Sequence, residues 1–229
     1  MQVLRCAAEF SYNPLALLAI SLPNTSSLPA PESLRRDVSE AIKGVRCADG
    51  LLPTPKYGLK NVSFSVCTEE IIHAPSSLIY NALLDFRQYH VWNTFVTEVQ
   101  LPAAVQTPAD VYPGMDMVFT TQGLVPGVDT LSIEIITLLY PPAPHKQPAK
   151  WKDWNHDDGY SIVAWESGVA VQAEHPTSLQ ELGGGNVRMI SWETYYRPND
   201  TVVLPIAGAL QSAFVQQGRD LKAYVEGLN

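Results

Sequence analysis

The last part of the chain carries apolar residues at helical spacing. Successive members are 4, 7, 4 and 3 positions apart, which places them on one side of a helix. They are Leu210, Phe214, Leu221, Val225 and Leu228. Pro205 marks the first turn of this helix, because a proline further inside would clash with the preceding turn. We therefore predict a long amphipathic helix from Ile206 onward, with its apolar side packed on another element.

Before this helix the pattern is typical of short strands. Val62, Phe64 and Val66 alternate with polar residues, which predicts a half-buried strand within 61–74. Six further strand-like runs follow, separated by turn signals such as Pro113-Gly114 and Gly183–Gly185. These runs are 95–101, 115–122, 130–139, 160–166, 178–182 and 187–196.

Two short helices are predicted between the first two strands, at 78–86 and 87–93, after Pro75 ends the first strand. The order is then strand, two short helices, six strands and a long helix. An α+β fold follows from this order, because the apolar side of the last helix can be buried only on the sheet. We place the domain at 56–229 and treat 1–55 as an N-terminal extension with one amphipathic helix, at 34–46.

The longest irregular stretch, 141–159, exceeds what a structural connection needs. It carries Trp151 and Trp154. We interpret it as a lid or binding loop beside the cavity.

Composition narrows the class of protein. A length of 229 residues suits one domain with an extension, and the net charge of −8 argues against surfaces for nucleic acid or anionic membranes. The apolar run 14–22 is far shorter than the about 20 residues that cross a bilayer. Cys6, Cys47 and Cys67 are an odd, scattered set, which predicts reduced thiols in a cytoplasmic protein. In the alternative, a secreted chain, the sequons at Asn24, Asn61 and Asn199 would be glycosylation sites.

The stretch 71–96 resembles the opening of the START-like (SRPBCC) superfamily that includes polyketide cyclases/dehydrases. The matching residues are Ala74-Pro75, Asp85-Phe86, Tyr89 and Trp92-Asn93. The resemblance covers about residues 60–229. It implies a helix-grip fold, in which a curved antiparallel sheet wraps around the C-terminal helix and a hydrophobic small molecule binds between them.

Proton-transfer chemistry would come from Glu193, His175 and Tyr195. The resemblance favours Glu193 and Tyr195 facing the helix, with His175 on the neighbouring strand. Directly opposite residues on antiparallel strands have Cβ atoms about 5 Å apart, so Glu193 and His175 could form an acid/base pair. Tyr195 would orient a substrate oxygen. The alternative is a structural hydrogen bond, with Pro176 breaking the strand beside His175.

Aromatic and apolar residues are the candidates for substrate binding, and the alternative is that they are simply core. They are Trp92, Tyr89, Trp165, Met117, Phe119, Phe214 and Trp154. We expect no metal, because His156-Asp157-Asp158 lacks separated partners, and no cofactor.

The leading hypothesis is a cofactor-free cyclase, dehydratase or isomerase acting on a polyketide- or terpenoid-like intermediate. A non-catalytic lipid or metabolite carrier and a protein-interaction module are the alternatives. A carrier should have a cavity nearly bare of ionisable groups, an enzyme should place at least one there, and an interaction module should have little cavity.

Overall fold

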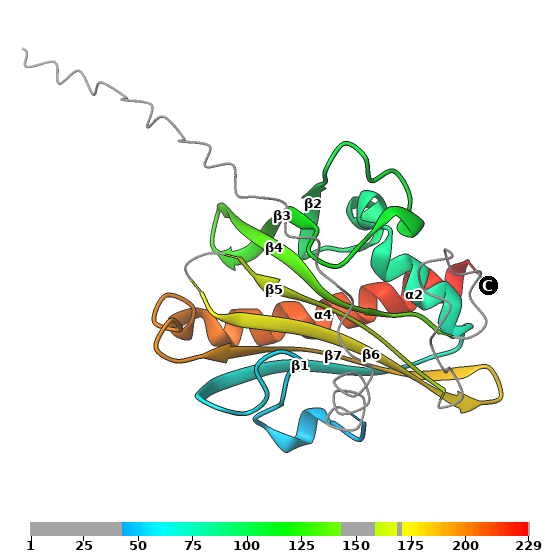
Figure 1. The fold of residues 1–229 in the computed structure, drawn as a ribbon, viewed down its shortest axis with the longest axis horizontal. Coiled ribbons are helices and arrows are strands. Elements are labelled where there is room, and N and C mark those ends of the chain that lie inside the picture. The colour runs from blue at the N-terminus through cyan, green and yellow to red at the C-terminus, as the bar shows by residue number, and fades with distance from the viewer. Residues whose placement is uncertain (1–42, 143–158, 169–170, 229) are drawn as a thin grey trace, which may run out of the picture.

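A computed structural model describes residues 43–142, 159–168 and 171–228 (Figure 1). In it a seven-stranded antiparallel sheet, in the order β1-β7-β6-β5-β4-β3-β2, curves around one long helix. The strands are β1 Val62–Ile72, β2 Val96–Gln100, β3 Asp116–Val125, β4 Val128–Tyr140, β5 Tyr160–Ser167, β6 Ala173–Gly183 and β7 Asn186–Tyr196. The helices are α2 Ser76–Leu84, α3 Tyr89–Trp92 and α4 Ala207–Gly227. Short 3-10 helices are η1 Cys47–Asp49, η2 Phe86–Gln88, η3 Pro108–Asp110 and η5 Leu204–Ile206.

The predicted helix-grip fold is therefore confirmed. Each predicted strand is present, and the one predicted at 178–182 starts earlier, at Ala173. Pro176 does not break it, contrary to the alternative considered from the sequence. Pro176 lies opposite Ala164 within the β5–β6 pairing, and His175 lies opposite Trp165.

Helix α4 buries the predicted apolar stripe on the inner face of the sheet. The buried members are Leu210, Phe214, Leu221 and Val225. Leu228 was predicted to belong to the stripe, but it is 56% exposed because it lies just after the helix ends. In the described part of the chain no helix is long and apolar enough to cross a membrane.

Side chains of α4 also bind the free edge of β1. The Gln211 amide pairs with the backbone of Cys67, accepting from its N–H at 3.0 Å and donating to its carbonyl at 2.8 Å. Lys222 donates to the carbonyl of Ile71, and Glu226 accepts from the N–H of His73. α4 therefore lies along this edge as well as across the sheet.

The closest approach of α4 to β1 occurs at Gly218. A Cβ atom at this position would lie 2.6 Å from Thr68 Oγ1 and 2.8 Å from its Cγ2. Real Cβ contacts are never this short, so only glycine permits the spacing seen here.

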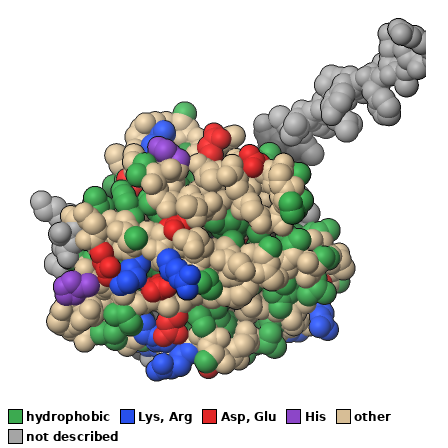
Figure 2. Space-filling view, turned by 180° about the vertical axis from the view of Figure 1, so that it is seen from behind, with side chains coloured by type: hydrophobic (Ala, Val, Ile, Leu, Met, Phe, Trp, Pro, Cys, Tyr) green, Lys and Arg blue, Asp and Glu red, His purple; other side chains and the backbone are tan. Residues whose placement is uncertain are grey.

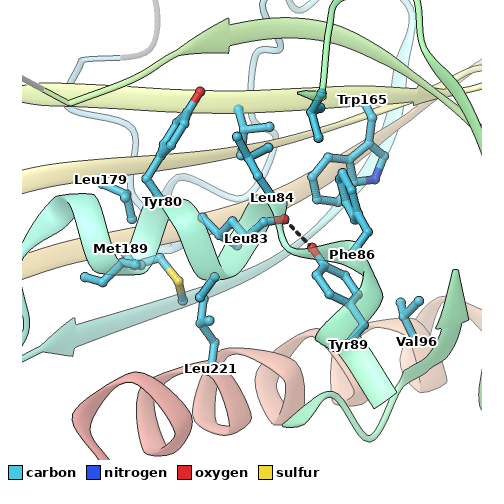
Figure 3. Packing of buried hydrophobic residues seen from close by; sticks show 14 of the residues in the cluster. Tyr80, Leu83, Leu84, Phe86, Tyr89, Val96, Trp165, Leu179, Met189 and Leu221 are labelled. Atoms are coloured by element: carbon cyan, nitrogen blue, oxygen red, sulfur yellow. Dashed lines mark hydrogen bonds between the residues drawn. The ribbon is translucent and has the colours of Figure 1, made fainter. Parts of the chain in front are cut away.

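The segment from α2 to α3 closes one side of the interior with aromatic rings (Figure 3). Phe86 lies 6.0 Å from Trp165 and 5.2 Å from Tyr89, measured between ring centroids. The Tyr89 hydroxyl donates to the Leu83 carbonyl at 2.8 Å, which fixes the ring.

The outer face of the sheet is covered by residues 45–58, which we call the strap. Val45 and Leu52 pack there with Trp192. Sheet side chains bind its backbone: Trp192 Nε1 donates to the carbonyl of Pro53, and Thr194 Oγ1 donates to that of Leu52. Most of the strap precedes residue 56, so the packed part of the chain begins earlier than the boundary we placed there. Of the helix predicted at 34–46, residues 34–42 lie outside the described residues and 43–46 are not helical.

The prediction of reduced thiols was wrong for two of the three cysteines. Cys47 in the strap and Cys67 in β1 form a disulfide, with Cα atoms 5.5 Å apart. The sequence does not reveal this pair because the residues meet only when the strap folds over β1.

Candidate functional site

A small cavity lies between the inner face of the sheet, α4 and the α2–α3 segment. It is lined by Leu83, Tyr89, Trp92, Trp165, His175, Thr177, Met189, Ser191, Gln217, Gly218 and Leu221. Its volume is about 10 Å³, roughly the space of one water molecule. A larger ligand must therefore displace side chains.

His175 is an ionisable group in this lining that lies between aromatic rings. Its ring centroid is 4.5 Å from that of Trp165 and 4.7 Å from that of Phe214. Burial lowers the pKa of His175 to about 3, so the imidazole is neutral at physiological pH.

Two hydroxyl groups are hydrogen-bonded in series to this imidazole. Thr177 Oγ1 donates to Ser191 Oγ at 2.9 Å, and Ser191 Oγ lies 2.7 Å from His175 Nε2. Since Ser191 already accepts from Thr177, its own proton is free to point at Nε2. When Nε2 accepts this proton, the ring proton lies on Nδ1.

Trp92 adds a donor that no described residue satisfies. Its indole N–H is buried and makes no hydrogen bond among the described residues, although Trp92 lines the cavity. An unsatisfied buried N–H costs about 1–3 kcal/mol, so an acceptor brought by a ligand would be stabilised here.

Three predicted substrate-binding residues, Tyr89, Trp92 and Trp165, thus line the cavity. Three others, Met117, Phe119 and Phe214, are buried in the core around it but are not part of the lining. Trp154, the seventh, and the candidate lid loop around it lie outside the described residues.

A second group of polar side chains lies on the same inner face. The Tyr195 hydroxyl donates to the Glu193 carboxylate at 2.7 Å, and the Tyr195 ring stacks on Phe64 with centroids 4.6 Å apart. Glu134, on β4, is only 5% exposed and is hydrogen-bonded by Ser132 and Ser167. We call Glu134, Glu193 and Tyr195 the acidic cluster.

The pKa values of both carboxyl groups in the acidic cluster are raised above their ordinary value. Burial raises the pKa of Glu193, against the opposing effect of the hydrogen bond from Tyr195. Burial also raises the pKa of Glu134, and repulsion from Glu193 raises it further. A pair of this kind retains a proton at neutral pH, so it can offer one acid and one base at once.

Similar solved structures share this architecture at low sequence identity. An aromatase/cyclase named Zhui, from a Streptomyces species, is 10% identical with a TM-score of 0.51, over 71% of this chain and 93% of that one. A hypothetical protein from Helicobacter pylori is 14% identical with a TM-score of 0.52, over 70% and 87% of the two chains. A START superfamily protein from Mycobacterium smegmatis is 14% identical, with a TM-score of 0.49, over 72% and 99%.

The chain has a helix-grip fold. No protein-family model matches the sequence, and no curated protein matches it either. The likeness to solved structures therefore concerns the fold alone, and function has to be argued from the site.

Within this helix-grip fold, Glu193 and His175 make no hydrogen bond to each other among the described residues. Glu193 and His175 both lie on the inner face, as predicted, but each has another partner. His175 is bound to Ser191, and Glu193 is bound to Tyr195 and interacts with Glu134. Burial of His175 among rings keeps it neutral, so it is a poor base.

Glu134 is the residue that the sequence analysis missed. It is the single carboxylate in the apolar run 131–139, on the same face as the buried Ile136. A charged residue at an inward position of a predicted strand indicates a candidate functional residue. Its electrostatic interaction with Glu193, three strands away, depends on the sheet order and cannot be found from spacing.

Proposed function

We propose that this protein binds a hydrophobic, oxygen-bearing small molecule between the sheet and α4, and acts on it by proton transfer. The reaction class is that of a cofactor-free cyclase, dehydratase or isomerase, on a polyketide- or terpenoid-like intermediate. One similar structure is an aromatase/cyclase, although its 10% identity supports only the fold.

The observation that carries the proposal is the acidic cluster on the inner face. Ser191 lines the cavity, and Glu193 follows it by two residues on the same face of β7, or about 7 Å along the strand. Burying two carboxyl groups close together costs stability, and such pairs with pKa values near neutrality are typical of acid/base sites.

The roles follow from the protonation state. The ionised carboxylate, assigned to Glu193, would take a proton from a carbon next to a carbonyl group. Protonated Glu134 would donate a hydrogen bond to the carbonyl oxygen, where negative charge develops. Tyr195, held against Glu193, would orient the same oxygen. The proton can then be returned to another atom of the substrate, which completes an isomerisation or assists loss of water.

Binding requires the cavity to open. Tyr89 and Trp92 lie on α3, a helix of four residues, and Trp92 stacks on Tyr224 of α4 with centroids 6.0 Å apart. Thr94, two residues after α3, also donates from its backbone N–H and its hydroxyl to Asp220 of α4. A shift of α3 away from α4 would enlarge the cavity and would break these bonds as well as the stack.

A carrier function is the second candidate. Among the described lining residues, His175 has an ordinary pKa near neutrality, but burial lowers this pKa and leaves the imidazole uncharged. The other lining residues are apolar or neutral polar. A neutral lining with hydroxyl groups and one free indole N–H suits reversible binding of a lipid or metabolite.

The test separates binding from turnover. Tryptophan fluorescence would follow binding of a panel of aromatic and polyketone compounds, and mass spectrometry would follow their conversion. The wild type, Glu193→Gln, Glu134→Gln and the surface control Glu98→Gln would be compared. Conversion that both cluster variants lose and the control keeps supports the enzyme. Binding without conversion in the wild type identifies a carrier, and no binding by any compound contradicts both.

A further inference from the structure

The disulfide between Cys47 and Cys67 is partly buried, because Cys67 is buried and Cys47 is half-buried. Cys67 is 8% exposed, on the outer face of β1, and 20 positions separate it from Cys47. The strap around it is held by further contacts, including Arg188, which donates to the carbonyl of Val45 at 3.0 Å and to Glu69 at 2.7 Å. Disulfides of this structural kind persist in oxidising compartments and are rare in the cytosol.

Two sequons lie on the surface at one end of the sheet. Asn61 is exposed in the turn before β1, in the left-handed conformation that asparagine tolerates, with φ of 63°. Asn199 and Thr201 are exposed in the turn after β7. Neither asparagine side chain makes a hydrogen bond among the described residues, so both amides point into solvent without losing a contact.

The two sequon turns are also joined to each other. The N–H of Arg197 donates to the carbonyl of Asn61 at 2.9 Å, and Ser63 Oγ donates to the carboxylate of Asp200. Groups attached at Asn61 and Asn199 would therefore project from the same end of the molecule. The strap and its disulfide would not be disturbed.

We propose that this chain matures in an oxidising secretory compartment, where Cys47 and Cys67 are joined and Asn61 and Asn199 receive N-linked glycans. In the first step both thiols lose a proton and together two electrons, which pass to the disulfide of a thiol oxidoreductase. In the second, each asparagine amide nitrogen bonds to the anomeric carbon of a lipid-linked oligosaccharide. The bond from that carbon to the pyrophosphate oxygen breaks, and the lipid pyrophosphate leaves with the proton released.

The disulfide supports the interpretation of the sequons as glycosylation sites. Asn-X-Ser/Thr triplets recur by chance, and they are modified only in chains that enter the secretory route. The disulfide is the observation that points to an oxidising compartment. The exposure of Asn61 and Asn199 is a separate observation, and it leaves both acceptors accessible to glycosylation in that compartment. This inference does not depend on the function proposed above.

The experiment uses the full chain, expressed in a eukaryotic cell and purified without reductant. Free thiols are alkylated, and intact mass is measured before and after removal of N-glycans by an endoglycosidase. Variants are Asn61→Gln, Asn199→Gln, Thr201→Ala and Thr201→Ser. Thr201→Ser keeps the sequon, so it controls for any effect on folding of changing the side chain in this turn.

The expected results are a Cys47–Cys67 linked peptide and a wild-type mass that falls when the glycosidase removes N-glycans. Asn61→Gln, Asn199→Gln and Thr201→Ala should each carry one N-glycan fewer than the wild type. Thr201→Ser should keep the wild-type mass. Alkylation of Cys47 and Cys67, or a wild-type mass unchanged by the glycosidase, overturns the proposal.

Discussion

The phenol of Tyr195 holds the carboxylate of Glu193 through a hydrogen bond of 2.7 Å between residues two apart on one face of β7. If Glu193 is the base, Glu193→Gln should lower turnover by roughly 10²–10⁴, because the amide keeps the volume and cannot accept the proton. Kinetics on a converted compound, with thermal unfolding as a check on folding, would measure this.

The matched control for that variant is Glu98→Gln, an exposed change on β2. It should leave both turnover and unfolding unchanged. Full activity in Glu193→Gln would show that another group moves the proton.

The acidic cluster should make stability depend on pH. The folded-state pKa values of Glu134 and Glu193 are raised above the ordinary value of 4.5, so the folded chain binds more protons than the unfolded chain from there up to the neutral range. Their contribution to stability is therefore complete below the ordinary value and is lost as the pH rises through the raised values. Glu134→Gln should flatten this decline.

Urea unfolding of wild type and Glu134→Gln at about pH 5 and about pH 8 would measure that difference. The variant should gain stability relative to wild type at the higher pH. An equal decline in both proteins would contradict the raised pKa of Glu134.

Packing of α4 should depend strongly on Phe214, which is 1% exposed and lies against His175 and Phe95. Phe214→Ala should cost about 3–5 kcal/mol of unfolding free energy through lost burial and a residual cavity. Arg219→Ala, an exposed change on the same helix, should stay within about 0.5 kcal/mol. Similar losses in both variants would argue against burial of Phe214 as the cause.

Gly218→Ala should destabilise the protein although alanine favours helices, because the new Cβ would lie 2.6 Å from Thr68 Oγ1. Adding Thr68→Ala removes the two nearest atoms and should recover much of the loss. Gly208→Ala, where no atom lies within 4 Å, should be neutral or stabilising. A double-mutant cycle from chemical unfolding would measure the coupling, and additive effects would contradict the clash.

The sequence predicted elements whose signals are local. The apolar stripe of α4 identified Leu210, Phe214, Leu221 and Val225 as buried, and alternation identified the strands. The prediction that Leu228 belongs to the buried stripe was wrong, since the apolar pattern does not show where the helix ends. The inward face of β7, with Glu193 and Tyr195, was also predicted correctly through the resemblance.

Pairings between distant strands could not be found in this way. His175 bonds to Ser191 instead of Glu193, and Glu134 interacts electrostatically with Glu193 across three strand steps. The partnership of Cys47 with Cys67 depends on a strap that folds over the outer face. Each of these depends on tertiary geometry that no spacing along the chain encodes.

The pairing of Gln211 with the backbone of Cys67 bears on how copies of this chain meet. Together with Lys222 and Glu226, it occupies backbone groups of Cys67, Ile71 and His73 that an incoming strand would need. The opposite edge, β2, is only five residues long and carries the exposed Glu98. Short, charged or covered edges resist strand addition between molecules. The protein should therefore withstand high concentration without edge-to-edge aggregation, and loss of the Gln211 amide would expose β1 as a template for it.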